Sequence, residues 1–162
     1  MGVSGSGKST IGAMLAQQLG WDFEDADNLH PAANIDKMRS GIPLTDEDRW
    51  PWLAAVAAWI DAVRSRKGHA VMACSALKRR YRDLLIGGRA DVRLIYLRGD
   101  EDLIAQRITA RRGHFMTASL LRSQFEDLEE PVAQENALVV SIDDQPGTLV
   151  KDIVAALRTA QQ

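Results

Sequence analysis

The stretch Gly2-Val3-Ser4-Gly5-Ser6-Gly7-Lys8-Ser9 fits the pattern G-x-x-x-x-G-K-[ST], which binds the phosphates of nucleotides. Its glycines let the backbone adopt conformations that a Cβ atom would exclude, so the N–H groups of the loop can converge on phosphate oxygens. Lys8 would place a cation against the β- and γ-phosphates, and the Ser9 hydroxyl would ligate Mg²⁺. We therefore expect the segment from Gly2 to Thr10 to contact a nucleotide.

A helix is expected directly after the loop, beginning near Lys8. Its apolar side chains recur at helical spacing and form one face, at Ile11, Met14, Leu15 and Leu19. Gly20 then supplies a C-terminal stop. The positive end of the helix dipole would face the same phosphates as the loop, which strengthens the prediction of an anion site.

The strand that normally delivers such a loop is not found before it. Only Met1 precedes Gly2, whereas strands usually run for about 5–6 residues. An empty central position in a parallel sheet would leave ladder groups unpaired and remove apolar area from the core. We therefore expect the first central strand to be missing from this sequence, and a Val/Ile-rich strand to be encoded upstream of Met1 in the natural chain.

Length and composition predict one ordinary soluble domain over residues 1–162. Hydrophobic residues make up 46% of the chain and charged residues 26%, as in typical globular proteins. The net charge of −2 gives no general attraction for nucleic acid or anionic membranes, so a small-molecule partner is expected instead. Cys74 is the single cysteine, and no long apolar run or leader pattern is found, which favours a cytoplasmic location.

Strand patterns alternate with helix patterns along the chain. Expected strands cover 21–25, 70–74, 92–97 and 138–142, and expected helices cover 31–40, 45–68, 77–86, 100–112, 117–129 and 146–160. This alternation predicts an α/β fold of three layers, with a parallel sheet covered by helices on both faces. Ligands bind at the carboxyl ends of strands in such sheets, which selects Asp25 and Asp27, Ser75 and Lys78, and the region after Leu97.

Two carboxylates follow the first expected strand, at Asp25 and Asp27. Phosphoryl transfer to a hydroxyl needs Mg²⁺ near the phosphates and a carboxylate that accepts the hydroxyl proton, and this pair could divide the two tasks. The spacing alone fits a polar loop equally well. A second common acid position is absent, because the next strand ends in Cys74 and Ser75, and this favours the Asp25/Asp27 pair as the metal site.

A basic segment follows Ser75, which is expected to be the N-cap of a helix. Three cations in the first turn would be disfavoured by the helix dipole, which suggests that an anion such as a substrate carboxylate is held nearby. Lys78 and Arg82 lie four residues apart on one face and are interpreted as functional. Arg79 and Arg80 are interpreted as a solvated basic face.

Arg107 and Arg111 also lie four residues apart, near the end of an expected helix before Gly113. One interpretation is a mobile lid around 107–120 whose arginines close over the phosphates and stabilise the transferring charge. The alternative is that these cations simply complement the negative end of the helix dipole. The sequence leaves both open.

Taken together, these motifs resemble those of the gluconate kinases, small P-loop kinases related in fold to shikimate kinase and adenylate kinase. The matching segments are Gly2 to Ser9, Asp25-x-Asp27-x-Leu29-His30-Pro31, Asn34-Ile35-x-Lys37-Met38, Gly41-x-Pro43-Leu44-x-Asp46-x-Asp48-Arg49, Pro51-Trp52-Leu53, Cys74-Ser75-Ala76-Leu77-Lys78, Tyr81-Arg82-Asp83-Leu84-Leu85, Ile95-Tyr96-Leu97, Arg111-x-Gly113-His114-Phe115, Gln124-Phe125-Glu126 and Leu128-Glu129-Glu130-Pro131. They cover most of the chain in the family's order. The departure lies at the N-terminus, where the family has a central strand before the loop.

The resemblance implies a P-loop NTPase fold of the nucleoside-monophosphate-kinase type. It also implies ATP-dependent phosphorylation of D-gluconate with Mg²⁺, by a protein that is a homodimer. Lys8, Asp27 and Arg111 would be catalytic, and Ser9 and Asp25 would serve the metal, Asp25 through its water shell. The substrate side would be formed by Asp27, His30, Arg49, Lys78, Arg82 and His114, and Arg107 would lie against the adenine.

Other classes of protein share the phosphate loop. A nucleotide switch or motor subunit uses the same loop, but the short chain and the acidic pair favour a kinase of small molecules. A shikimate kinase matches much less of the chain, and an inactive nucleotide-binding relic would fit the missing strand. An assay of ADP release with and without gluconate separates these alternatives.

Overall fold

The computed structural model describes residues 1–110 and 118–159 of the chain. Four short strands are present in this part, namely β1 (Asp22–Asp25), β2 (Ala70–Ala73), β3 (Ile95–Arg98) and β4 (Leu138–Ser141). The helices are α1 (Lys8–Leu19), α2 (Ala32–Arg39), α3 (Asp46–Ser65), α4 (Arg79–Ile86), α5 (Glu101–Ala110), α6 (Ala118–Asp127) and α7 (Pro146–Thr159), with 3-10 turns η1 (Ala26–Leu29) and η2 (Ala133–Glu135). Arg111, His114 and much of the expected lid lie outside the described residues.

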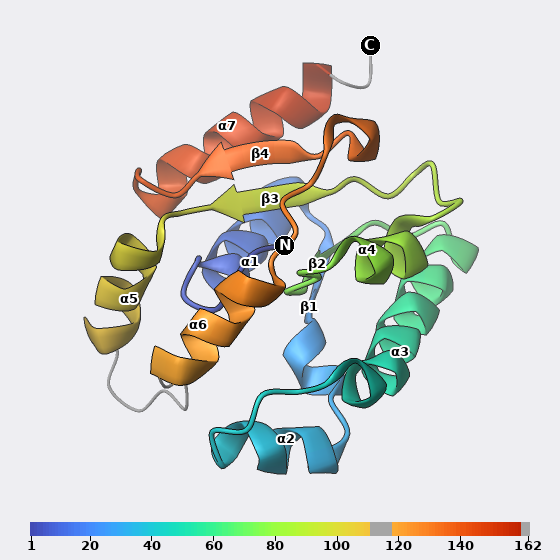
Figure 1. Ribbon diagram of the computed structural model, residues 1–162. Helices are drawn as coiled ribbons and strands as arrows, with labels where there is room; N and C mark the ends of the chain where they lie inside the picture. The colour runs from blue at the N-terminus through green and yellow to red at the C-terminus, as the bar shows by residue number, and fades with distance from the viewer. Residues whose placement is uncertain (111–117, 160–162) are drawn as a thin grey trace.

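The strands form two parallel pairs, β1 with β2 and β3 with β4. The start of the chain lies between the pairs and contacts both of them (Figure 1). The Met1 amino group donates to Ile95 O at 2.5 Å, and Leu97 N–H donates to Met1 O at 3.0 Å. On the other side, Gly2 N–H donates to Ser75 O at 3.2 Å. Met1 and Gly2 therefore occupy the central position at which the sequence analysis expects a missing strand.

Two hydrophobic clusters show that helices pack on both sides of these strands. One cluster joins α1, α7, α5 and α6 to β3 through buried residues such as Leu15, Leu97 and Ile153. The other joins α3 and α4 to the segment after β2 through residues such as Trp52, Tyr81 and Cys74. Figure 1 shows α3 and α4 together on one side of the molecule, away from α7. The expected α/β fold with parallel strands between helices is confirmed.

A cavity of about 690 Å³ lies where the two strand pairs meet. Its lining is mostly apolar and comes from β2, β3, α1, α3 and α7, with Met1, Met72, Cys74 and Ile95 among its residues. Burial, together with the charge of Lys8, lowers the pKa of the Met1 amino group from 8.0 to about 5. Burial also raises the pKa of the Cys74 thiol to about 11, which disfavours the thiolate that a nucleophilic cysteine needs.

Filling this cavity with a strand is expected to stabilise the protein. An N-terminal extension of five Val/Ile-rich residues should raise the Tm by about 5 °C or more, because it would pair the facing edges of β2 and β3 and bury apolar area. Scanning calorimetry measures the change, and a Gly/Ser extension of equal length is the control. Equal Tm values for the two extended proteins would show that the space between β2 and β3 does not accept a strand.

Most expected elements are present, and two of them, α4 and β3, start two or more residues later than expected. Helix α4 begins at Arg79 with Lys78 as its N-cap, so the prediction that Ser75 caps this helix is wrong. The backbone turns at Ala76, which has a φ of 45°, and this turn delays the start of the helix. The third strand begins at Ile95, later than the expected start at position 92.

The longest helix of the described residues, α3, begins with a capping box. Asp48 N–H donates to Thr45 Oγ1 at 3.3 Å, and Thr45 N–H donates to Asp48 Oδ2 at 2.9 Å. Across residues 1–110 and 118–159, we find no helix with the length and apolar character that crossing a membrane requires. Helix α3 instead buries Trp52, Leu53 and Val56 in the core and carries Arg49 to the site described next.

Candidate active site

The phosphate loop leads into α1 through glycines with left-handed backbone conformations. Gly5 has a φ of 81° and Gly7, the N-cap of α1, has a φ of 92°. A Cβ atom on Gly5 would lie only 2.8 Å from Ile108 Cγ1, so the loop can approach α5 closely only with glycine at this position. No side chain caps α1, which leaves its first N–H groups directed at a ligand position, as expected for an anion site.

Contacts within the chain hold the Lys8 side chain and the backbone of the loop in place. Lys8 Nζ donates to Val3 O at 2.9 Å, which folds the ammonium group over the loop. The Ser4 N–H donates to Gln124 Oε1 on α6 at 2.7 Å. The loop is therefore tied to α6, although nothing in the sequence pattern assigns a role to Gln124.

Ser9 and Asp25 meet at the place where a metal is expected. Ser9 Oγ donates to Asp25 Oδ2 at 2.5 Å, and Asp25 Oδ1 accepts from Asp27 N–H at 3.0 Å. This second bond caps η1, so Asp27 lies in the first turn of a 3-10 helix instead of in an open loop. The described residues hold no group of three His, Cys, Asp or Glu side chains that could cage an ion. A hydroxyl and one carboxylate beside a phosphate loop fit Mg²⁺, which keeps several waters and takes phosphate oxygens as ligands.

Asp27 is placed to act on a substrate. Its side chain is 80% accessible to solvent. Partial loss of hydration near the protein surface, together with the Asp25 carboxylate, raises the pKa of Asp27, while Lys8 acts in the opposite direction. Asp27 is therefore an accessible carboxylate whose basicity exceeds that of an ordinary aspartate.

His30 lies beside Asp27, with Nε2 of the ring 3.9 Å from Asp27 Oδ1. The ring stacks on Trp52 with a centroid distance of 4.2 Å, and its side chain is only 4% exposed. Burial and the charge of Arg49 lower the pKa of His30 from 6.5 to about 4, so the ring is neutral at pH 7. A neutral imidazole at this position can donate or accept one hydrogen bond at the edge of the site.

The lowered pKa of His30 gives a pH dependence of stability. Below pH 6.5 the unfolded state binds a proton that the folded state refuses until about pH 4, so the free energy of unfolding falls across this window. After allowance for solvent screening we expect this loss to be about 2 kcal/mol. Denaturant titrations at several pH values measure it. The variant His30→Phe keeps the stack on Trp52 and should lose this part of the slope, and an unchanged slope would contradict the prediction.

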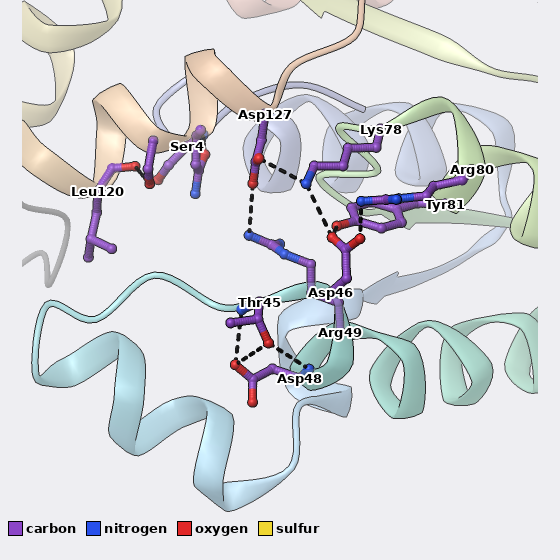
Figure 2. Close-up of polar contacts among 12 residues, drawn as sticks. Ser4, Thr45, Asp46, Asp48, Arg49, Lys78, Arg80, Tyr81, Leu120 and Asp127 are labelled. Carbon is purple, nitrogen blue, oxygen red and sulfur yellow. Dashed lines mark hydrogen bonds and ion pairs between the residues drawn. The ribbon is translucent and has the colours of Figure 1, made fainter.

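Figure 2 shows a cluster of cations that includes Lys78 and Arg49, both of which contact Asp127. Lys78 Nζ lies 3.0 Å from Asp127 Oδ1 and 3.2 Å from Asp46 Oδ1. Burial alone would lower the pKa of Lys78, but the contacts with Asp127 and Tyr81 outweigh it and raise the pKa. Lys78 is therefore a fixed, fully charged group at neutral pH.

Arg49 joins the same cluster from α3. Its Nη2 lies 3.8 Å from Asp127 Oδ2, and the residue is only 8% exposed. Its Nε is buried and has no hydrogen-bond partner in the described part of the chain. A buried donor without a partner is costly, so this group indicates that a ligand acceptor completes the cluster.

The anion expected near the start of α4 is supplied in part by the chain itself. Arg79 N–H donates to Glu129 Oε2 at 2.6 Å. Asp46 pairs with Arg80 as well as with Lys78, and it accepts a hydrogen bond from Tyr81. The interpretation of Arg80 as merely solvated therefore needs correction, because its guanidinium pairs with Asp46. Arg79 contacts Glu129 through its backbone N–H, and its side chain is exposed, as the interpretation of a solvated face expects.

Arg82 differs from the expectation. Its buried guanidinium forms two bonds with Glu135, at 2.5 and 2.9 Å, and donates to Leu77 O at 2.8 Å and Ala76 O at 3.2 Å. These partners use its donors to hold the turn before α4. The geometry thus favours a structural role for Arg82 over direct contact with a substrate.

The remaining expected residues are only partly placed. Arg107 Nη2 donates to Ile142 O at 2.6 Å, which ties α5 to the end of β4. Ile142 follows directly after β4, so Arg107 stands at the carboxyl edge of the strands, where the nucleotide is expected. Arg111 and His114 lie outside the described residues.

Comparison with known proteins places this site in a family. The shikimate kinase family model matches residues 4–158 of the chain. The thermoresistant gluconokinase of Escherichia coli (strain K12) is 49% identical over 146 residues, which cover 90% of this chain and 83% of that protein. The chain belongs to the gluconokinase family. A probable gluconokinase of Mus musculus is a second relative, 43% identical over 98% of this chain and 95% of its own length.

Solved structures of related proteins agree with membership of the gluconokinase family. A gluconokinase from Sinorhizobium meliloti 1021 superposes with a TM-score of 0.89 at 42% identity, covering 99% of this chain and 90% of that one. A shikimate kinase from Aquifex aeolicus superposes with a TM-score of 0.63 at 16% identity, covering 99% of this chain and 95% of that one. The latter likeness shows a shared fold only. As a gluconokinase-family protein, the chain is a P-loop kinase with the α/β fold of shikimate kinases.

The local sequence assigns no role to two carboxylates and one amide that contact the candidate site, Asp46, Asp127 and Gln124. Asp46 lies in the first turn of α3, where acidic residues are favoured in any helix. Its contact with Lys78 therefore leaves no mark of its own in the sequence. Gln124 and Asp127 lie three positions apart on α6, a spacing that places them on one face. That spacing is the only local indication that both contact the site.

Proposed function

We propose that this protein transfers the γ-phosphoryl group of ATP to the 6-hydroxyl of D-gluconate and so forms 6-phosphogluconate. Membership of the gluconokinase family supports the proposal, and one structural observation carries it. His30 links the two parts of the site, because it lies 3.9 Å from Asp27, a carboxylate with a raised pKa, and is also influenced by the charge of Arg49 in the cation cluster with Lys78. That cluster contains a buried donor, Arg49 Nε, with no partner in the described part of the chain. This arrangement fits a substrate with a hydroxyl at one end and a carboxylate at the other.

The nucleotide would be held by the loop. N–H groups of the loop and of the first turn of α1 would bind phosphate oxygens, and Lys8 would leave Val3 O to contact the β- and γ-phosphates. Mg²⁺ held near Ser9 and Asp25 would offset the charge of the phosphates when bound. Arg107, at the end of β4, would lie on the adenine side.

The transfer step would use Asp27 as general base. Asp27 would accept the proton of the 6-hydroxyl while the oxygen of that hydroxyl attacks the γ-phosphorus. ADP would leave from the opposite side. The raised pKa of Asp27 suits this task because it brings the carboxylate nearer to the operating pH. From the family resemblance, we propose that Arg111 stabilises the charge that develops on the transferring group.

The carboxylate of gluconate would bind at the cation cluster. Lys78 and Arg49 would share it with the carboxylates of Asp46 and Asp127 already present, and the unpaired Arg49 Nε would donate to it. His30, neutral and next to Asp27, would contact a hydroxyl of the chain of the sugar acid. His114 is proposed for the same side from the resemblance alone.

Replacing Lys78 should therefore change gluconate binding specifically. In Lys78→Met we expect the KM for gluconate to rise about tenfold with little change in the KM for ATP, since a charge-assisted bond to the carboxylate is lost. Initial-rate kinetics with each substrate varied in turn measure the effect. Lys151→Met, on the exposed face of α7, is the matched control. An unchanged KM for gluconate would exclude Lys78 from the substrate side.

A panel of sugar acids with ATP tests the function directly. Release of ADP should depend on gluconate, should be weaker with a neutral polyol, and should not be supported by shikimate. Gluconate-independent hydrolysis of ATP would favour a nucleotide switch, and no ADP release at all would favour an inactive nucleotide-binding protein. We also propose a homodimer from the family resemblance, which light scattering of the protein in solution tests.

A further inference from the structure

Helix α6 contacts both halves of the proposed site. Gln124 Oε1 accepts from Ser4 N–H in the phosphate loop at 2.7 Å. One turn later, Asp127 Oδ1 lies 3.0 Å from Lys78 Nζ, and Asp127 Oδ2 lies 3.8 Å from Arg49 Nη2. Residues three apart share one side of a helix and are about 4.5 Å apart along its axis. One rigid element therefore spans from the nucleotide loop to the cation cluster.

The chain after α6 strengthens this connection. Glu129 N–H donates to Leu77 O at 3.0 Å, and Glu129 Oε2 accepts from Arg79 N–H at 2.6 Å. On its apolar side, α6 packs through Leu121 into the cluster that also contains Val3 of the loop. Movement of α6 would thus disturb the loop and the start of α4 together (Figure 2 shows Asp127 pointing from α6 toward Lys78 and Arg49).

We propose that α6 couples the binding of nucleotide to the binding of the sugar acid, with Gln124 and Asp127 as its positioning residues. Both ligand positions are those of the function proposed above, on which the coupling rests. Gln124 fixes α6 relative to the phosphate loop, and Asp127 fixes α6 relative to Lys78 and Arg49. Neither residue needs to touch a reacting atom for this role.

The sign of the coupling follows from the geometry. A sugar acid bound at the cation cluster would add to the contacts that already hold Lys78 and Arg49, and through Asp127 it would restrain α6 further. Gln124 then holds Ser4, so the phosphate loop is ordered before the nucleotide arrives. The ligand that binds second therefore loses less conformational entropy in ordering the loop and α6. The two ligands then bind with positive cooperativity.

Calorimetric titration of the whole protein with a non-hydrolysable ATP analogue, with and without saturating gluconate, tests the coupling. In the wild type, gluconate should lower the Kd of the analogue about fivefold or more. In Gln124→Met, which keeps side-chain length but removes the acceptor, the ratio of the two Kd values should fall to about one. Gln124→Glu keeps an acceptor oxygen and should retain the ratio. The two Kd values of one variant, with and without gluconate, contain the same direct effect of the added charge on nucleotide affinity. Their ratio therefore cancels this effect.

Asp127→Asn should lose the coupling as well, and the double variant with Gln124→Met should lose no more than either single variant, because both residues act through one helix. Glu126→Gln, exposed on the same helix, is the control and should keep the wild-type ratio. A wild-type ratio of one, or an unchanged ratio in Gln124→Met, would overturn the proposal. Absence of gluconate-dependent ADP release in the wild type would instead contradict the proposed function, so the two failures are distinguishable.

Discussion

Replacing Lys8 by alanine is expected to lower kcat by about 10²–10³-fold or more while leaving the fold intact. Phosphoryl transfer places most of its developing charge on the β- and γ-phosphate oxygens, and Lys8 is the cation that the loop carries for them. Its ammonium rests on Val3 O in this structure, 2.9 Å away, so it lies within the loop and needs only a local change to reach a phosphate. Loss of this charge removes stabilisation that exists mainly in the transition state.

Single-turnover measurements with saturating ATP and gluconate give the size of the Lys8 effect, and circular dichroism with a thermal melt checks the fold. Lys151→Ala on α7 serves as the matched control because this side chain is exposed and distant in sequence from the loop. Near-normal turnover in Lys8→Ala would exclude the role assigned to Lys8. A lost fold would leave the kinetic result without meaning, so Lys8→Met, which keeps the aliphatic part of the side chain, is the second variant.

Replacing Asp27 by asparagine is expected to lower kcat by about 10²–10⁴-fold, with a much smaller effect on the Kd of ATP. An amide can still hydrogen-bond the substrate hydroxyl, but it cannot accept the proton during attack. The structure supports this division of tasks, because Asp25 rather than Asp27 contacts Ser9 Oγ, at 2.5 Å. Asp27 instead stands accessible beside His30 with a raised pKa.

The Asp27 prediction is checked by measuring turnover at saturation and, separately, the binding of a non-hydrolysable ATP analogue with Mg²⁺. Asp152→Asn, exposed on α7, is the control for a lost carboxylate elsewhere. If binding of the analogue with Mg²⁺ collapses while turnover at saturation survives, Asp27 belongs to the metal site. Asp25→Asn should show that pattern instead, with weakened binding of the nucleotide in the presence of Mg²⁺.

Local sequence patterns were sufficient for most of the fold. The glycines of the loop, the apolar face of α1 and the stop at Gly20 all act within a few residues, so their spacing predicts their structure. The same holds for the capping box of Thr45 and Asp48 at the start of α3. The start of α4 was missed because the turn at Ala76, with its positive φ, lies beside contacts that distant segments make. Arg82 donates to Ala76 O and pairs with Glu135, and Gly2 N–H donates to Ser75 O.

The sequence by itself determined the phosphate loop, the acidic pair at the end of β1 and the membership of the family, because these features consist of residue types at short, fixed spacings. The partners of the functional side chains were decided only by the tertiary structure. Ser4 and Gln124 are 120 positions apart, and Arg82 and Glu135 are 53 positions apart, yet each pair forms a direct hydrogen bond. Such pairs are set by how helices pack on the strands, and no local periodicity encodes them. For the same reason, only the folded chain reveals that Arg82 is buried in an ion pair while Lys78 and Arg49 face the site.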